Sequence, residues 1–174
     1  MQRHSLPTRY DLSFGISEAI RNVIDKSSIK PKDISLVSLS TTLATNALVE
    51  DQGGRVALIF VGFRDGDLAK HSINDALRGD PVLQTKGGHN HAGDETCRIN
   101  LEEIKEWILK RDGVSAFAVA SQFATRNAAH ELQIMELIRN LTDKPVTASH
   151  QLSSKLNGPR RALTAVLNAR LIAV

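Results

Sequence analysis

Hydrophobic residues recur every three or four positions in four stretches of the chain, which is the spacing of an amphipathic helix. The first stretch covers residues 11–27, where Asp11 or Ser13 can cap the helix. Its apolar positions are Leu12, Ile16, Ala19, Ile20, Val23 and Ile24. We therefore predict a helix close to the start of the chain.

The other three helical stretches lie in the second half. One begins after Asn100, which can cap it while Glu103 makes the reciprocal contact of a capping box. Its inner stripe is Leu101, Ile104, Trp107 and Ile108. The next covers residues 127–141, and the last covers residues 161–174. In the former, the inward positions are predicted to be Leu132, Met135 and Ile138.

Short apolar runs between the helices have the length and composition of strands. They are residues 34–40, 55–62, 113–121 and 144–150. A helix over residues 41–51 is expected to separate the first two, closed by Gly53 and Gly54. Strands that alternate with helices predict an α/β fold, with a mostly parallel sheet covered by helices on both faces.

The pattern weakens between residues 63 and 100. Residues 65–80 read as one or two short helices, and residues 86–96 as a glycine-rich loop. No strand is predicted here.

Composition indicates one soluble domain over residues 1–174, with 41% hydrophobic and 24% charged residues. The single cysteine, Cys97, excludes an internal disulfide and fits a reducing compartment. No apolar run approaches the ~18 residues of a membrane-spanning helix, and the start has no signal-peptide core. We therefore expect a cytoplasmic protein without a membrane partner.

The net charge is +3, and most of the chain mixes both signs. Residues 144–174 differ, because they contain five basic residues and no acid: Lys144, Lys155, Arg160, Arg161 and Arg170. Such a basic face can meet a phosphate, a nucleic acid or an acidic partner surface. Aromatic residues make up 4% of the chain, which gives base-stacking recognition of nucleic acid no support. A non-catalytic module that binds a partner subunit through this face stays an alternative function.

A group of small polar side chains follows the predicted strand at residues 34–40. Its members are Ser40, Thr41, Thr42, Thr45 and Asn46. They can cap the following helix, or they can border a ligand crevice, because ligands bind beyond the carboxyl ends of parallel strands. The free N–H groups of a helix start also suit a phosphate or a carbonyl oxygen. Both interpretations remain open from chemistry alone.

Several histidines invite a functional interpretation. His89 and His91 form an H-x-H pair beside Asp94 and Cys97, which can chelate zinc, although loop packing is the simpler interpretation. His150 follows a strand and either lines the crevice or is a partly buried, hydrogen-bonded histidine.

Two helix starts carry further polar residues. At the start of the helix over residues 127–141, Glu131 favours the helix dipole and His130 caps the helix or faces solvent. Arg161, Thr164 and Asn168 share one face of the last helix, which can reach an anionic group or dock on another lobe.

Several ordered motifs together resemble the hydantoinase A and 5-oxoprolinase family. The main one is "STTLATNALVEDQGGRVALIFVGFRD" at residues 40–65, which is similar to the family's "GTT-x-ATNAL" to "GFRD" run. "GGHNHAGD", "VASQFATRNAAHE" and "SHQLSSKLNGPRRALTAVLNARLI" follow in the family's order, with Ala128 where proline is usual.

The resemblance implies part of the first lobe of an actin-like ATPase fold. Family members open cyclic amides such as hydantoins or 5-oxoproline, using ATP and a divalent cation. The family's opening glycine-rich phosphate loop is not found in this sequence. We therefore expect an inactive fragment that depends on a second lobe, and on a hydantoinase B-like subunit as a further partner.

The resemblance also favours contact with a small cyclic-amide substrate for the threonine and asparagine group. Together with two residues of the last helix, the predicted substrate-binding residues are Thr41, Thr42, Thr45, Asn46, Arg161 and Asn168. Catalytic residues are not identified. No metal site is expected, and His89 and His91 are the weak candidates for one.

Overall fold

The computed structural model describes residues 12–27, 34 and 53–172, and the chain divides into two units, Met1–Asn46 and Ala47–Val174. In the first unit, helix α1 spans Leu12–Ser27, which confirms the first predicted helix. Apart from Ile34, the predicted strand over residues 34–40 and helix over residues 41–51 lie outside the described residues. A single domain over residues 1–174 stays a prediction.

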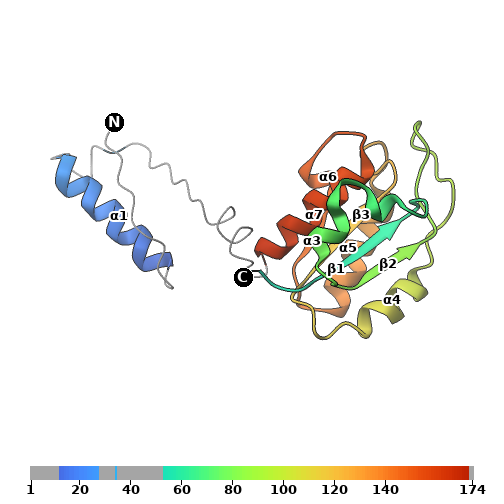
Figure 1. Cartoon of the computed structure of the whole chain (residues 1–174), viewed down its shortest axis with the longest axis horizontal. Helices are drawn as coiled ribbons and strands as arrows, with labels where there is room; N and C mark the ends of the chain where they lie inside the picture. The colour runs from blue at the N-terminus through green and yellow to red at the C-terminus, as the bar shows by residue number, and fades with distance from the viewer. Residues whose placement is uncertain (1–11, 28–33, 35–52, 173–174) are drawn as a thin grey trace. The chain divides into compact units, whose positions relative to one another are not determined.

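The second unit, called the C-terminal unit below, is built on a four-stranded parallel sheet with the order β2-β1-β3-β4 (Figure 1). The strands are β1 (Val56–Val61), β2 (Val82–Thr85), β3 (Ala116–Ser121) and β4 (Val146–Ala148). All three strand pairs are parallel, so every connection is a crossover. The predicted α/β fold with a parallel sheet is confirmed.

Helices fill these crossovers, and two more follow the last strand. They are the 3₁₀ helix η2 (Asp67–Ser72) and the α-helices α3 (Ile73–Leu77), α4 (Leu101–Leu109), α5 (Ala129–Leu141), α6 (Ser149–Leu152) and α7 (Gly158–Ile172). Helix α7 begins three residues before the predicted start.

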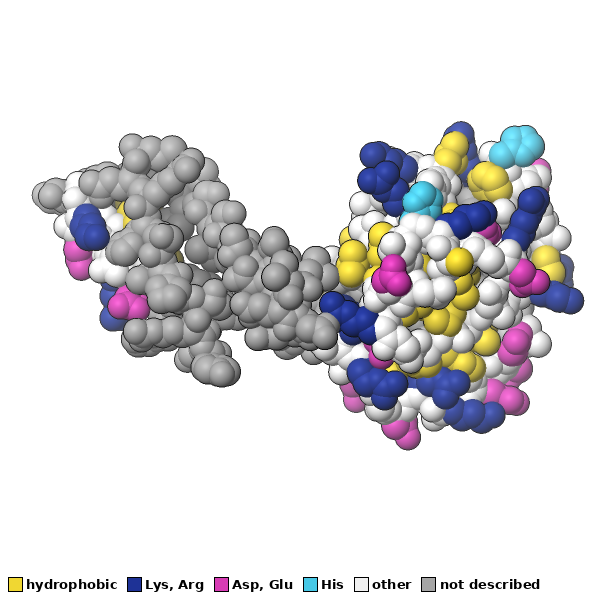
Figure 2. Space-filling view, viewed as in Figure 1, with side chains coloured by type: hydrophobic (Ala, Val, Ile, Leu, Met, Phe, Trp, Pro, Cys, Tyr) yellow, Lys and Arg dark blue, Asp and Glu magenta, His cyan; other side chains and the backbone are white. Residues whose placement is uncertain are grey.

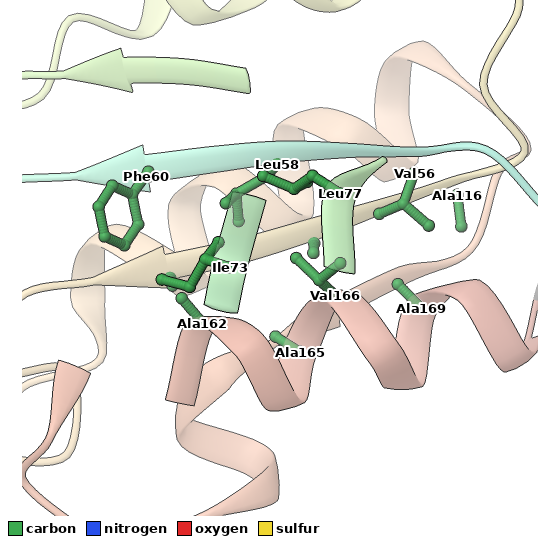
Figure 3. Close-up of a cluster of buried hydrophobic side chains, with 12 residues drawn as sticks. Val56, Leu58, Phe60, Ile73, Leu77, Ala116, Ala162, Ala165, Val166 and Ala169 are labelled. Carbon is green, nitrogen blue, oxygen red and sulfur yellow. The ribbon is translucent and has the colours of Figure 1, made fainter. Parts of the chain in front are cut away.

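One face of the sheet packs against α3 and α7. Alternate side chains of β1 and β3 meet Ile73 and Leu77 of α3 and a row of small residues on α7 (Figure 3). The α7 row is Ala162, Ala165, Val166 and Ala169. Small side chains let the helix lie close to the strands.

The opposite face is covered by α4 and α5. Ile104 and Ile108 of α4 and Ile134 and Ile138 of α5 pack on the remaining side chains of β1 and β3. Both strands are buried along their whole length, as expected for central strands of a parallel sheet.

Two predictions about these helices need correction. Leu132 is 51% exposed and Ile134 takes the inner position, because the two residues lie about 200° apart around a helix. The Asn100 cap is confirmed, since its Oδ1 accepts a hydrogen bond from the Glu103 N–H at 3.2 Å. The Glu103 carboxylate was predicted to make the reciprocal contact of the capping box. It instead accepts a hydrogen bond from Thr85 Oγ1 at 2.9 Å, at the end of strand β2, which was not predicted.

Candidate functional site

The strand order places a topological switch point between β1 and β3. From β1 the chain moves outward to β2 on one side, and later returns to β3 on the other side. The loops that follow β1 and β3 therefore diverge at the carboxyl edge of the sheet. In open α/β sheets this is where ligands bind.

A cleft of about 280 Å³ lies at this switch point. The loop after β1 supplies one wall, the loop after β3 a second, and the start of α7 a third. The residues that line it are Phe63, Asp67, Lys70, His71, Gln122, Phe123, Leu156, Asn157, Gly158 and Pro159. We call it the switch-point cleft.

Two non-glycine residues of this cleft have left-handed backbone conformations. Phe123 has φ 54° and His71 has φ 55°. Such values are uncommon for residues with a side chain, and they cluster where function constrains the backbone. Both loops that form the cleft are thus held in costly conformations.

The start of α7 is fitted closely against the loop after β1. A Cβ atom on Gly158 would lie 2.4 Å from Cε1 of Phe63, so no larger residue fits without displacing that ring. Asn157 Oδ1 accepts a hydrogen bond from the Arg160 N–H at 3.1 Å, and its Nδ2 lies 3.1 Å from His71 Nε2. Asn157 thereby caps α7 and bridges two walls of the cleft.

Charge in the cleft is locally balanced. Lys70 donates a hydrogen bond to Asp67, and this bond lowers the pKa of the Asp67 carboxyl below its ordinary value. The Asp67 carboxylate also accepts a hydrogen bond from the Arg64 N–H at 3.0 Å. The pair leaves the cleft without a large net charge.

A buried carboxylate organises the neighbouring ends of β3 and β4. Glu131, on the first turn of α5, is 0% exposed and accepts four hydrogen bonds. Its Oε1 accepts from the Ser121 N–H at 2.7 Å and from Ser149 Oγ at 2.6 Å. Its Oε2 accepts from the His150 N–H at 2.9 Å, and His150 Nδ1 lies 2.6 Å away. The predicted partly buried, hydrogen-bonded His150 is confirmed.

Arg161 joins the same network from α7. It is 2% exposed, and its guanidinium donates to Ser121 O at 3.0 Å and Lys155 O at 2.8 Å. Burial lowers the pKa of Arg161, while the charge of Glu131 opposes that shift. Arg161 thus ties β3 to the segment after α6, which continues into Leu156 and Asn157 at the cleft.

A second buried cluster lies between α5 and the glycine-rich loop. His130 is 1% exposed; its Nδ1 accepts a hydrogen bond from the Gly88 N–H at 3.0 Å, and its Nε2 lies 2.8 Å from Glu95 Oε1. The expectation that His130 caps its helix or faces solvent is wrong, because His130 is the contact that holds this loop against α5.

The predicted H-x-H pair is divided by the fold. His89 is 2% exposed and lies beside His130, with ring centroids 4.4 Å apart, whereas His91 is exposed. Within the described ranges, no three side chains of the metal-binding types are grouped so that they could hold an ion. Loop packing accounts for His89.

We expect acidification to destabilise the C-terminal unit through this cluster. Burial, and then the charge of His130, lower the pKa of His89 below its ordinary value of about 6.5. The unfolded chain then binds the extra proton, so the stability present above about pH 6.5 is lost as the pH falls through the folded pKa. The hydrogen bond with His130 lowers the pKa of Glu95, which adds a second loss at lower pH, below the ordinary carboxyl value.

Urea unfolding at pH 7, 6 and 5 measures the effect. His89→Gln should flatten the change between pH 7 and 5, whereas the same substitution at exposed His91 should leave it as in the parent. Equal pH dependence in the two variants would contradict the assignment to His89.

The predicted site residues have different outcomes. Thr41, Thr42, Thr45 and Asn46 lie outside the described residues. Arg161 is buried in the network above, and Asn168 Oδ1 accepts a hydrogen bond from Thr147 Oγ1 at 3.2 Å. Direct substrate contact by any of the six predicted residues stays a prediction.

The basic residues after position 143 do not form one basic face, which corrects the expectation. Arg161 and Arg170 are 2% and 5% exposed, so their charges are inside the unit. Lys144 Nζ donates to two backbone carbonyls, those of Arg111 and Asp112. On the side of the unit seen in Figure 2, basic and acidic side chains are interspersed.

Arg170 fastens the last turn of α7 to the sheet. Its Nη2 donates to Asp80 Oδ2 at 2.7 Å and to Ala76 O at 2.9 Å, and its Nη1 donates to Gly54 O at 3.3 Å. Asp80 Oδ2 also accepts from the Val56 N–H at 2.8 Å, where β1 begins.

None of the helices in the described ranges is long and apolar enough to cross a membrane.

The cleft residues Gln122, Phe123 and Asn157 were missed by the sequence analysis. Gln122 and Phe123 directly follow the predicted strand over residues 113–121, so the rule that ligands bind beyond carboxyl ends could have found them. For Asn157, the signal was an Asn-Gly-Pro run before a helix.

The chain is similar to parts of several longer proteins. It is 27% identical to the acetophenone carboxylase gamma subunit of Aromatoleum aromaticum, over 94% of this chain and 27% of that protein. It is 25% identical to 5-oxoprolinase 1 of Arabidopsis thaliana, over 90% of this chain and 16% of that protein. The chain therefore spans about a quarter or less of the relatives it matches.

A solved structure shares the fold. The ATP-dependent caprolactamase from Pseudomonas jessenii superposes with a TM-score of 0.70 at 24% identity, covering 94% of this chain and 27% of that one. The family described as the hydantoinase/oxoprolinase N-terminal region matches residues 2–142. That match covers most of the chain, and the chain belongs to the hydantoinase/oxoprolinase N-terminal region family.

Proposed function

We propose that this chain forms the N-terminal part of an ATP-dependent hydrolase that opens a cyclic amide, such as a hydantoin or 5-oxoproline. The observation that carries the proposal is the family match over residues 2–142, together with a 5-oxoprolinase among the relatives. Because the chain spans a small part of those proteins, the complete activity requires further parts of the enzyme.

The described residues do not fit a nucleotide or its cation. The sequence lacks the family's glycine-rich phosphate loop, and no metal-binding group of three side chains occurs in the described ranges. We assign ATP and the divalent cation to other parts of the enzyme. The role left for this chain is to position the ring.

The geometry of the cleft supports that role. An amide carbonyl is a poor electrophile, so opening the ring demands orientation and exclusion of water more than a strong protein nucleophile. The switch-point cleft offers aromatic side chains and uncharged amide groups, and two of its walls contain a residue in a left-handed conformation. The buried Glu131 and Arg161 hold the β3 and α7 walls in place.

Carboxylation of a ketone is the second candidate function. It is favoured by the relative that is a subunit of acetophenone carboxylase and matches 94% of this chain. A ketone, like a lactam, presents one unreactive carbonyl oxygen to the enzyme. On either proposal a partner subunit is needed, such as a hydantoinase B-like chain.

Assays of the full-length protein, with any subunit that copurifies, separate the two functions. We expect ATP hydrolysis that depends on the presence of a cyclic amide. Mass spectrometry should detect the ring-opened acid as the product. The 174-residue chain alone is the inactive control. Bicarbonate-dependent carboxylation of a ketone without ring opening would replace the first proposal by the second.

A further inference from the structure

We infer that the switch-point cleft binds the cis-amide edge of a cyclic secondary amide, and that Gln122 is the residue that recognises it. This inference rests on the proposed function, because it names how the ring is held. Four features of the cleft carry it: the fixed position of Gln122, its unused amide group, the nature of the walls and the small size.

The backbone of Gln122 is fixed from two sides. Its N–H donates to Val61 O at 3.0 Å, and its carbonyl accepts from the His89 N–H at 3.2 Å. Gly88 lies directly beside it, since a Cβ atom at Gly88 would be 3.2 Å from Cβ of Gln122. Gln122 is therefore held between the end of β1 and the glycine-rich loop that follows β2.

The side-chain amide of Gln122, in contrast, makes packing contact only: its Oε1 would lie 3.7 Å from a Cβ atom placed on Gly88. Gln122 lines the cleft, and no hydrogen bond joins its amide group to any residue in the part of the chain that the structure describes. A primary amide presents one donor and one acceptor side by side.

A cyclic secondary amide presents the matching edge. Peptide bonds of open chains are trans, so their N–H and C=O point in opposite directions. A small ring forces the cis form, which places N–H and C=O on the same side. Gln122 can then donate to the ring carbonyl and accept from the ring N–H, as glutamine does in its bidentate pairing with adenine.

The walls suit an uncharged ring. Phe63, Phe123 and Leu156 give apolar surface for ring carbons, and the charge of Lys70 is offset by Asp67. The volume of about 280 Å³ lies just below the range for small-molecule pockets, roughly 300–1,000 Å³. The cleft thus favours a small lactam or hydantoin over a nucleotide or a strong anion.

Binding to the 174-residue chain tests the inference by NMR titration with ¹⁵N labelling. The probes are ε-caprolactam, which has the cis N–H and C=O, its N-methyl derivative, which lacks the donor, and ε-caprolactone, which lacks the nitrogen. We expect ε-caprolactam to shift the side-chain NH₂ signals of Gln122 and the amide of Phe123. Both analogues should bind about tenfold more weakly or worse, because a hydrogen bond at Gln122 is left unmade.

Two variants give the matched comparison. Gln122→Leu should lose about tenfold or more in affinity for ε-caprolactam, while Gln133→Leu, the same change at an exposed position of α5, should bind as the parent. Melting temperatures and amide spectra report whether each variant is folded. If Gln122→Leu is unfolded, Gln122→Glu, which keeps the size but loses the donor, replaces it.

The inference is overturned if the three probes bind equally, if folded Gln122 variants keep the parent affinity, or if inorganic phosphate displaces ε-caprolactam from the cleft. These results are independent of the ring-opening assay. Ring opening that survives in a full-length Gln122→Leu protein would leave the proposed function standing and remove the inference. Selective lactam binding without ring opening would do the reverse.

Discussion

Replacing Glu131 with alanine is expected to lower the free energy of unfolding of the C-terminal unit by about 3–5 kcal/mol, which is the usual loss when one partner of a buried charge network is removed. Glu131 is 0% exposed and its carboxylate accepts hydrogen bonds from Ser121, Ser149 and His150. Alanine leaves those donors without an acceptor, and it leaves the buried charge of Arg161 without its counter-charge.

Urea unfolding of Glu131→Ala, Glu131→Gln and Glu136→Ala measures this loss. Glu136 is an exposed glutamate on the same helix, so its replacement should change stability by less than about 0.5 kcal/mol. Glu131→Gln keeps the shape but not the charge, and should fall between the other two. If Glu131→Ala costs no more than Glu136→Ala, the network does not stabilise the fold.

Gly62→Ala is expected to have an effect of similar size for a different reason. Gly62 follows β1 with φ 75°, and a Cβ atom there would lie 2.4 Å from the Gly87 carbonyl oxygen and 2.9 Å from Gly88 Cα. The obstacle is backbone of the neighbouring loop, which has no rotamer to move. The methyl group therefore combines left-handed strain with a clash, and we expect a loss of about 3 kcal/mol or more.

Gly79→Ala separates the two contributions. Gly79 has a similar φ of 81°, but nothing lies within 4 Å of the added atom, so only the strain of about 1 kcal/mol remains. Thermal and urea unfolding of both variants give the difference directly. If both variants lose the same stability, the loops after β1 and β2 can move apart at little cost. The close approach of Gly62 to Gly87 would then not constrain the fold.

The fold class could be predicted because its signals are local. The apolar runs of β1 and β3 and the Asn100 cap each lie within about ten residues. Strand β2 was missed because it is an edge strand of four residues, of which only Thr85 is buried, and so short a run does not differ from a loop. Leu132 was misplaced because both it and Ile134 are apolar, and periodicity alone did not decide which one faces the sheet.

The candidate site could be predicted only in part. Glu131, Ser149 and Arg161 come from α5, α6 and α7, and nothing in the spacing along the chain shows that they meet. From the sequence, His130 and Glu131 are ordinary residues of a helix start. Their roles follow only from the fold, which brings the loop from Gly88 to Glu95 and the end of β4 beside them. Gln122 could have been found from the sequence, but the rule that ligands bind beyond the carboxyl ends of strands was applied to the group from Ser40 to Asn46 and to His150, not to the residues after the strand over residues 113–121.

The contacts of Arg170 have a consequence for the order in which the protein is made. Gly54, which Arg170 holds beside the start of β1, is synthesised 116 residues before its partner. At 5–20 residues per second, a ribosome needs roughly 6–23 s to cover that distance. During this interval α3 has already been made, but the part of this face of β1 that α7 later covers stays open. The apolar side chains of this face are then open to other surfaces, so the nascent chain has a period in which chaperone binding competes with aggregation.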